Sequence, residues 1–406
     1  MKKTKAALIL SLILAVSSGC LPSRAAEEPI ELSFLTSGTG NAAEEIREDL
    51  EAQIQEDFPN VSISVEAYPD EQFYSILNTR LSTGNGPDFF SVQPYLAGPN
   101  GVQKLADAGY MEPLNDLSII QNAPEEQTAP MSSDGNVYSL SRFEMILCTY
   151  YNEDLFAQCN LSVPTNWQEF LDCCAVLKSN GIQPLISGNK DSFVLQFGIY
   201  QIAASQVYAK NPDYNAQLYT GETRFTDPGT WDEAIRRYLL LYDEGYVQPH
   251  SLKMGQTEAL ERFADGDAAM MMGGNFNDNT ILDAIDGRFS LKSFPLPGND
   301  EGEPLYGVIS KTGGYAIYSQ SEHLDLCKQI LEKLYGNNDE EEENELFQAF
   351  DSLRENGQFT VNCNQGWQGD VEWALEDGLS RYIGGDDLSV HDITNQMQEQ
   401  LQKNET

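Results

Sequence analysis

Four short segments of the sequence combine aromatic rings with side chains that form hydrogen bonds in a plane. They are Ser141-Arg142-Phe143-Glu144, residues 189–193 with Asp191 and Phe193, Asn275-Phe276, and residues 362–367 ending in Trp367. A sugar has flat apolar faces surrounded by hydroxyl groups. Aromatic rings can stack on those faces, and carboxylate, amide and guanidinium groups, each with two polar atoms in one plane, can form hydrogen bonds with neighbouring hydroxyl groups. These residue types therefore predict a binding site for a ligand of that kind.

Each segment also has a purely structural interpretation. Arg142 and Glu144 can form a surface ion pair, Phe276 can belong to a core, and Trp367 can cover the core of a domain. Unpaired charges are costly to bury, so the polar residues inside the strand-like run 134–156 argue against plain core. Our hypothesis is that this run crosses between two lobes and that its polar middle faces a cleft.

Two classes of enzyme have partial signals. Gly38-Thr39-Gly40-Asn41-Ala42-Ala43 follows a predicted strand and Glu66 ends the next one, which is nearly the fingerprint of a dinucleotide site. A pair of carboxylates would serve a glycosidase, but in a chain with 63 acidic residues such pairs occur by chance. The sequence has no GxSxG motif, no CxxC pair and no clustered His, so no metal or cofactor is predicted.

The first residues are organised as an export signal. A basic segment, residues 1–5, precedes an apolar segment, residues 6–16, that is too short to span a membrane. Ser18-Gly19-Cys20 resembles a bacterial lipobox, although Ser17 stands where Leu is usual. This implies a lipoprotein signal peptide over residues 1–20 and lipidation of Cys20; ordinary cleavage after Ala25 is the alternative. Both interpretations export the protein.

Charge limits the partners of the protein. The chain has 24 basic and 63 acidic residues, a formal net charge of −39. Such a surface repels nucleic acid and disfavours dense contact with anionic lipid. We therefore expect no nucleic-acid partner, and membrane attachment through the lipid anchor only.

Length and cysteine content leave more open. A chain of 406 residues predicts two or more domains. Disulfides and buried free thiols are both compatible with the six cysteines besides Cys20. These are Cys148, Cys159, Cys173, Cys174, Cys327 and Cys363.

Strand and helix patterns alternate along the chain. Residues 30–35 and 61–67 are typical of strands on either side of a helix at 42–56, and such a unit predicts a parallel sheet. Trp167 and Trp231 begin amphipathic helices and are expected in a core. The tail from Asp370 is expected to be helical, with few apolar residues, and to fray. The predicted fold class is α/β.

Five stretches in a fixed order carry a resemblance to a known family. They are residues 81–88 (LSTGNGPD), 109–114 (GYMEPL), 134–156, 164–170 (PTNWQEF) and 263–274. In this order, behind an export signal, they resemble the extracellular solute-binding proteins of carbohydrate ABC transporters, the family 1 proteins that include maltose-binding protein.

The resemblance implies a two-lobed, periplasmic-binding-protein-like fold with crossing hinge strands that closes on a ligand. The N-terminal lobe would be residues 27–143 plus 276–318, and the C-terminal lobe residues 144–275 plus 319–406. The chain would cross between lobes in residues 134–156, near Asn275 and near Tyr315.

The resemblance also implies a role for the protein and its partners. It would be a monomer that captures a mono- or oligosaccharide and delivers it to permease subunits, without catalysis. The identity of the sugar, and the possibility of a non-sugar solute, stay open. Ligand contacts would come from Arg142, Phe143, Glu144, Asp191, Phe193 (where the family usually has Trp), Asn275, Phe276, Gly314, Tyr315 and Trp367, with Ser37 and Thr39 after the first strand.

Overall fold

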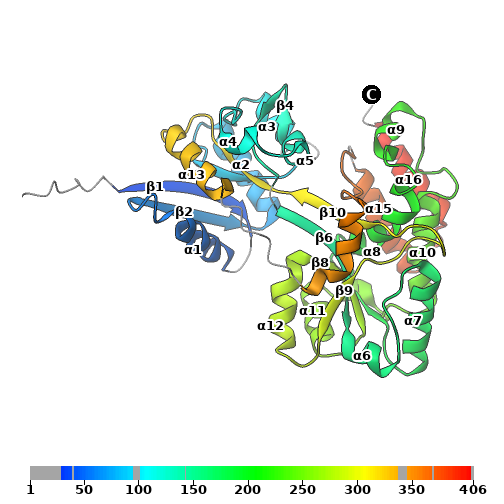
Figure 1. The fold of residues 1–406 in the computed structure, drawn as a ribbon. Helices are drawn as coiled ribbons and strands as arrows, with labels where there is room; N and C mark the ends of the chain where they lie inside the picture. Colours follow the sequence, from blue (N-terminus) through cyan, green and yellow to red (C-terminus); the bar gives the residue numbers. More distant parts are fainter. Residues whose placement is uncertain are drawn as a thin grey trace, which may run out of the picture.

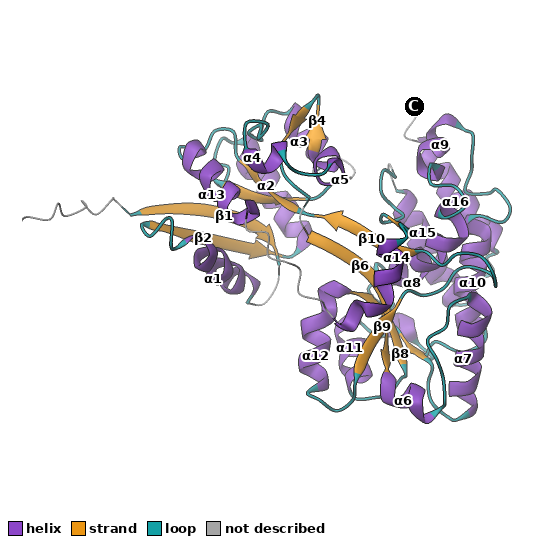
Figure 2. Ribbon diagram, in the orientation of Figure 1, coloured by secondary structure: helices purple, strands orange, loops and turns teal. Residues whose placement is uncertain are grey.

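The computed structural model describes residues 29–38, 41–94, 101–141, 143–336, 345–367 and 370–403. They form two lobes, each built around its own sheet, and strands β6 (Phe143–Asn152) and β10 (Gly307–Thr312) lie where the lobes meet (Figure 1). Helices surround both sheets (Figure 2). The predicted α/β class is therefore confirmed.

The sheet of lobe 1 has the order β11-β3-β1-β2. Strands β1 (Ile30–Ser37), β2 (Val61–Tyr68) and β3 (Phe89–Val92) are parallel, and β11 (Gly314–Ile317) runs antiparallel to β3. The parallel β1–β2 pair and the connecting helix α1 (Ala42–Ile54) confirm the predicted strand–helix–strand unit. Successive side chains point to opposite faces, so Phe34 and Leu35 enter different apolar clusters and both faces of the sheet are buried.

The remaining elements of lobe 1 cover these two faces. They are α2 (Asp70–Ser82), α3 (Val102–Asp107), α4 (Ser118–Gln121), α5 (Glu125–Thr128), the 3₁₀ turn η2 (Ala129–Met131), the hairpin β4 (Ser132–Ser133) and β5 (Asn136–Val137), and α13 (Leu324–Gly336).

The sheet of lobe 2 has the order β12-β10-β6-β8-β7, and β9 (Leu291–Phe294) also pairs with β6. Strand β7 (Leu185–Ile186) is parallel to β8 (Met270–Gly274), and β12 (Phe359–Thr360) is parallel to β10. This sheet too is buried on both faces, because alternate residues of β6 enter separate apolar clusters.

The helical elements of lobe 2 flank this sheet (Figure 1). They are α6 (Glu153–Gln158), α7 (Trp167–Ser179), α8 (Val194–Ala203), the π turn η3 (Ala204–Tyr208), α9 (Tyr214–Thr220), α10 (Trp231–Asp243), η4 (Ser251–Lys253), α11 (Gln256–Ala264), η5 (Asn275–Asn277), α12 (Asp278–Ile285), η6 (Glu345–Phe350), α14 (Asp351–Glu355), α15 (Val371–Ile383) and α16 (Val390–Lys403).

Residues 134–156 are not one long strand. The β4–β5 hairpin turns at Asp134 and Gly135, both with positive φ, and belongs to lobe 1, whereas β6 starts at Phe143 and belongs to lobe 2. The chain therefore changes lobes between Ser141 and Phe143. The segment Asn152-Glu153-Asp154 predicts a helix cap, since Asn is favoured at that position. The structure confirms it, because Asn152 Oδ1 accepts a hydrogen bond of 3.1 Å from the Leu155 amide at the start of α6.

The predicted division into lobes is corrected at two places. Residues 276–312 lie in lobe 2, because α12 packs in its core and both β9 and β10 pair with β6. Helix α13 lies in lobe 1, where Cys327, Ile330 and Leu331 pack against the sheet. The chain thus returns to lobe 1 at Gly313, which has a φ of +62°, and not near Asn275.

The C-terminal helices are part of the lobe 2 core. Leu375 and Leu379 of α15 and Ile393, Met397 and Leu401 of α16 are almost fully buried, so the prediction that the tail frays is wrong. Few apolar residues suffice here because they share one face of each helix. Trp167 and Trp231 are buried as predicted.

The six cysteines besides Cys20 are all free, which settles the alternative that the sequence left open for them. Burial raises the pKa of the Cys148, Cys174 and Cys363 thiols well above the ordinary range. Within the described ranges, no helix has the length and apolar character of a membrane span.

Candidate functional site

The carboxyl ends of the parallel strands in both lobes lie next to the chain crossing. In lobe 1, Val92 at the end of β3 pairs with Gly314, immediately after the crossing at Gly313. In lobe 2, Gly274 at the end of β8 pairs with Leu147, and β6 begins four residues earlier at the other crossing. Ligands of open α/β sheets bind outside the carboxyl ends of strands. The facing edges of the two lobes are thus the candidate site, and Figure 1 shows the ends of β1 and β2 directed toward lobe 2.

Three phenylalanine rings form an aromatic platform at the lobe 2 edge. Phe197 is buried in α8, and its ring centroid lies 5.9 Å from that of Phe193 and 5.3 Å from that of Phe276. The two outer rings are 46% and 52% exposed. Large apolar groups exposed together on a rigid support are typical of a binding surface. The sequence placed Phe193 and Phe276 in separate segments; the fold joins them through Phe197, which the sequence analysis missed.

Asn275 fixes the position of Phe276 beside the crossing. Its Oδ1 accepts a hydrogen bond of 3.0 Å from the Ile146 amide, and its Nδ2 donates one of 2.8 Å to the Glu144 carbonyl. The side chain thereby continues the pairing of β8 with β6 for one more residue. Gly274 is required here, since a Cβ on it would lie 2.3 Å from the Phe276 ring. Asn275 was predicted to contact ligand, but its amide is used within the protein.

Glu144 and Asp191 are likewise engaged in the fold. Arg354 donates a hydrogen bond of 2.6 Å to Glu144 Oε1. The negative charge of Glu144 is therefore balanced by Arg354, and a surface ion pair with Arg142 is not required for that. Asp191 Oδ2 accepts a hydrogen bond of 2.8 Å from the Gln256 amide at the start of α11. Asp191 thus anchors the loop that carries Phe193.

A cluster of polar side chains adjoins the platform where α8 and α15 meet. Gln196 Nε2 donates to both Glu372 and Glu376, Ser192 Oγ donates to Glu376, and Asn364 Nδ2 donates to Glu372. We call these five residues the acidic cluster. Burial raises the pKa of Glu376. No sequence signal predicted this cluster. Its members come from three separate segments, and with 63 acidic residues in the chain a pair of glutamates does not stand out.

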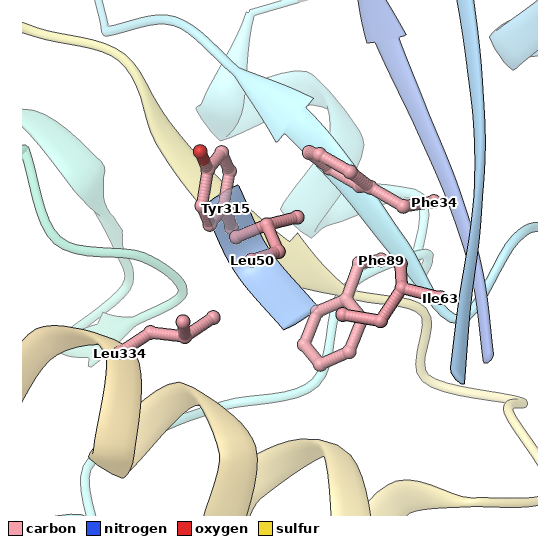
Figure 3. A pocket seen from close by; sticks show the side chains of 6 residues that line it. All are labelled: Phe34, Leu50, Ile63, Phe89, Tyr315 and Leu334. Atoms are coloured by element: carbon pink, nitrogen blue, oxygen red, sulfur yellow. The ribbon is translucent and has the colours of Figure 1, made fainter. Parts of the chain in front are cut away.

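Gly314 and Tyr315 belong to the interior of lobe 1. A Cβ on Gly314 would lie 2.3 Å from the Leu140 carbonyl oxygen, so glycine is needed for close backbone packing. The Tyr315 ring packs on Phe34 and Tyr335 and lines a void of about 10 Å³ with apolar walls (Figure 3). That void has room for no more than about one water molecule. Tyr315 is partly buried by these contacts, and the ligand contacts at the two residues stay predictions.

Trp367 is not a stacking platform. It is 4% exposed, its ring packs on Tyr200, Phe225 and Trp231, and its Nε1 donates to Asn215 Oδ1 at 3.1 Å. This is the core interpretation that the sequence left open. Trp373, in contrast, is 58% exposed on α15, next to Glu372.

The lobe 1 edge offers a different set of groups. Ser37 ends β1 and is half-buried. Arg80 donates to both oxygens of Glu66 at 2.7 and 2.8 Å, which lowers the pKa of this carboxyl group. Glu66 would have to bind ribose in a dinucleotide site, but it is already paired. Thr39, Arg142 and Cys20 lie outside the described residues, as does the side chain of Phe143.

Lobe 2 also has a cavity of about 530 Å³ between the end of α10, the segment 247–253 and the end of α15. Its floor includes Tyr242, Gln248 and Ser251, which form buried hydrogen bonds with Ser187 and Asn189. No group of three His, Cys, Asp or Glu side chains in the described part of the chain is arranged to hold a metal ion.

Known proteins share this architecture over nearly the whole chain. A chitin oligosaccharide-binding protein superposes with a TM-score of 0.75 at 20% identity, covering 92% of this chain and 98% of its own. RafE in complex with raffinose gives a TM-score of 0.73 at 17% identity, covering 93% and 100%. At these identities the likeness shows the fold alone, and it confirms the predicted two-lobed, periplasmic-binding-protein-like architecture.

Sequence comparison leads to the same group. The multiple sugar-binding protein of Streptococcus mutans is 23% identical over 339 residues, covering 80% of this chain and 75% of that protein. The family model of the bacterial extracellular solute-binding proteins matches residues 39–340. Because this match spans well over half of the chain, the protein belongs to the bacterial extracellular solute-binding proteins.

Proposed function

We propose that this protein captures a carbohydrate between its two lobes outside the cell and delivers it to an ABC permease. The observation that carries the proposal is the aromatic platform, with Phe193 and Phe276 half-exposed over buried Phe197 at the edge that faces the crossing. The apolar face of a sugar ring can stack on such rings, and the carboxylates and amides of the acidic cluster can accept or donate hydrogen bonds at the hydroxyl rim.

The names of similar proteins support a carbohydrate ligand. A multiple sugar-binding protein is similar in sequence, and structures described with raffinose and with chitin oligosaccharide are similar in fold. Sugar binding in those proteins agrees with the chemistry of the platform, which was derived from this chain alone.

Closure of the lobes would complete the site. The exposed halves of the two rings offer surface that a ligand or the opposite lobe can cover, and the crossings between Ser141 and Phe143 and at Gly313 would provide the hinge. Opening of the lobes would then release the ligand unchanged. We include Ser37, Thr39, Arg142 and Phe143 among the ligand contacts.

Membrane attachment and partners complete the proposal. Lipidation of Cys20 would hold a monomer at the outer face of the cell membrane, where a pair of permease subunits and a cytoplasmic ATPase receive the ligand. The net charge of −39 keeps the remaining surface away from anionic lipid. The mass of protein extracted from membranes tests this: a diacylglycerol adduct that is absent from Cys20→Ala supports the anchor, and cleavage after Ala25 refutes it.

A thermal-shift screen tests the carbohydrate. A ligand that binds only the native state raises the melting temperature, so at least one member of a broad panel of mono- and oligosaccharides should do so. Each hit is then incubated with the protein and analysed for sugar release. If no sugar shifts the transition while a peptide or a polyol does, the carbohydrate assignment fails. Release at enzymatic turnover would refute the role as a pure binding protein.

A further inference from the structure

The acidic cluster holds two carboxylates with neutral donors only. Glu372 and Glu376 are one helical turn apart on α15, and the single amide group of Gln196 donates to both. The other donors are the Ser192 hydroxyl and the Asn364 amide. Glu376 is 9% exposed. Burial of a carboxylate without a cation is costly, so this arrangement requires an explanation.

No cation in the described part of the chain compensates this charge. Neither Glu372 nor Glu376 forms an ion pair there, whereas Asp377 on the same helix pairs with Arg381 at 3.5 Å. The first turn of α8 does not compensate it either. The amides of Val194, Leu195 and Gln196 already donate to backbone carbonyls of residues 191–193.

A further unfilled hydrogen-bonding group lies at the same place. Tyr200 follows Gln196 by one turn of α8, is fully buried, and its hydroxyl has no hydrogen-bond partner. Burial raises the pKa of Tyr200, and Glu372 and Glu376 raise it further, so the hydroxyl lies within electrostatic reach of both carboxylates. The described groups of the protein therefore leave both the charge of the cluster and this nearby hydroxyl without a partner.

We propose that the ligand carries a protonated amino group that binds at the acidic cluster while its ring stacks on the platform, which makes it an amino sugar. This rests on the proposed carbohydrate function and names the chemical class of the ligand. Phe193 directly follows Ser192 and Phe197 directly follows Gln196, so the platform and the cluster share the start of α8. An ammonium group is attracted by the carboxylates and also by the face of an aromatic ring.

Matched pairs of sugars test the proposal. Isothermal titration compares glucose with glucosamine, galactose with galactosamine, and cellobiose with the disaccharide of glucosamine, at a pH at which the amines are protonated. In at least one pair the amino member should bind at least tenfold more tightly. N,N′-Diacetylchitobiose, in which the charge is blocked, should lose this advantage.

Two charge-removing variants and a matched control locate the effect. Glu372→Gln and Glu376→Gln should each weaken binding of the preferred amino sugar at least tenfold and change binding of its neutral counterpart less than threefold. Asp377→Asn removes the same charge from α15 outside the cluster and should have less than a threefold effect on both sugars. This control separates a local contact from general attraction of cations by an acidic protein. Glu372 is only half-buried, so its variant tests the same contact with the smaller change to the core.

Three outcomes would overturn the proposal. If the neutral member of every pair binds as tightly as the amino member, the ligand is a neutral sugar. The amino-sugar proposal then fails, while the proposed carbohydrate function stands. If Asp377→Asn weakens binding as much as the cluster variants, the preference is not local to the cluster. If no sugar of either kind binds, the proposed carbohydrate function itself fails.

Discussion

The facing edges of the two lobes carry carboxylates in opposite electrical surroundings. Near the end of β2 in lobe 1, Glu66 is bound by the Arg80 guanidinium, which lowers the pKa of Glu66. In lobe 2, Glu376 has only neutral donors, and burial raises its pKa. Lobe 2 also exposes two aromatic rings at this edge.

This difference indicates that the two lobes contribute differently to ligand binding. The Glu66 carboxylate of lobe 1 is balanced by Arg80 within the lobe, so it does not require a charged partner on the ligand. Lobe 2 offers exposed ring surface and two carboxylates that no cation compensates in the described part of the chain. We therefore expect recognition of the ligand to depend mainly on lobe 2.

The largest effect is expected from removing the platform. Phe193→Ala together with Phe276→Ala should weaken binding of the best sugar about ten- to hundredfold. Full burial of a Phe side chain stabilises by about 1.5–3 kcal/mol, but each ring is already about half covered, which leaves about 1.5–3 kcal/mol for the two. Isothermal titration measures this loss.

The matched change in lobe 1 is Ser37→Ala, for which we expect less than a threefold loss. Both variants should keep the unfolding midpoint in urea close to that of the wild type, because the removed groups are partly exposed. A larger loss from Ser37→Ala than from the double Phe variant would reverse the assignment of the lobes.

A smaller effect is expected from Asn275→Ala, which removes the two hydrogen bonds to β6 that position Phe276. Leaving the Ile146 amide and the Glu144 carbonyl without these partners should destabilise the protein by about 1–3 kcal/mol. Binding should weaken about tenfold. In a Phe276→Ala background the same change should leave affinity almost unaffected. If it weakens binding there as well, Asn275 contacts the ligand directly, as the sequence analysis predicted.

The smallest effects concern stability and pH, and they should have opposite signs in the two lobes. Glu66 has a lowered pKa, so it stabilises the fold above its unfolded pKa and loses this contribution as the pH falls through the folded pKa. Glu376 has a raised pKa, so its ionisation costs stability as the pH rises from the unfolded value through the folded one.

At pH 7, Glu66→Gln should therefore lower the melting temperature and Glu376→Gln should raise it. Both differences should shrink as the pH falls to 4. The Glu66 effect should be modest and should weaken in salt, because the pair is partly exposed. Shifts of the same sign in both variants would remove the electrostatic contrast between the lobes.

Local signals predicted much of the fold correctly. The strand–helix–strand start, the Asn152 cap and the burial of Trp167 and Trp231 all depend on residues within a few positions of one another. The lobe membership of residues 276–312 and of α13 was wrong, because it depends on pairing across long separations. Ile309 pairs with Ile146, and Leu331 packs near Leu32.

The candidate site was predicted only in part. Phe193 and Phe276 were identified as aromatic residues in polar segments, and both lie exposed on the platform. Tyr315 and Trp367 occur in similar segments and are used inside their lobes. An aromatic residue in a loop has the same local sequence whether it faces ligand or core, so the sequence could not separate the two pairs.

The sequence by itself determined the α/β class and the family, because these reside in composition, periodicity and ordered motifs, whereas the export signal stays a prediction. Only the tertiary structure decided which groups meet. Gln196 reaches Glu372 and Glu376 across more than 170 residues of chain, and Phe197 joins Phe193 to Phe276. Such contacts form when α8 packs between the sheet and α15. The residues of one segment do not determine which distant segments will pack against it.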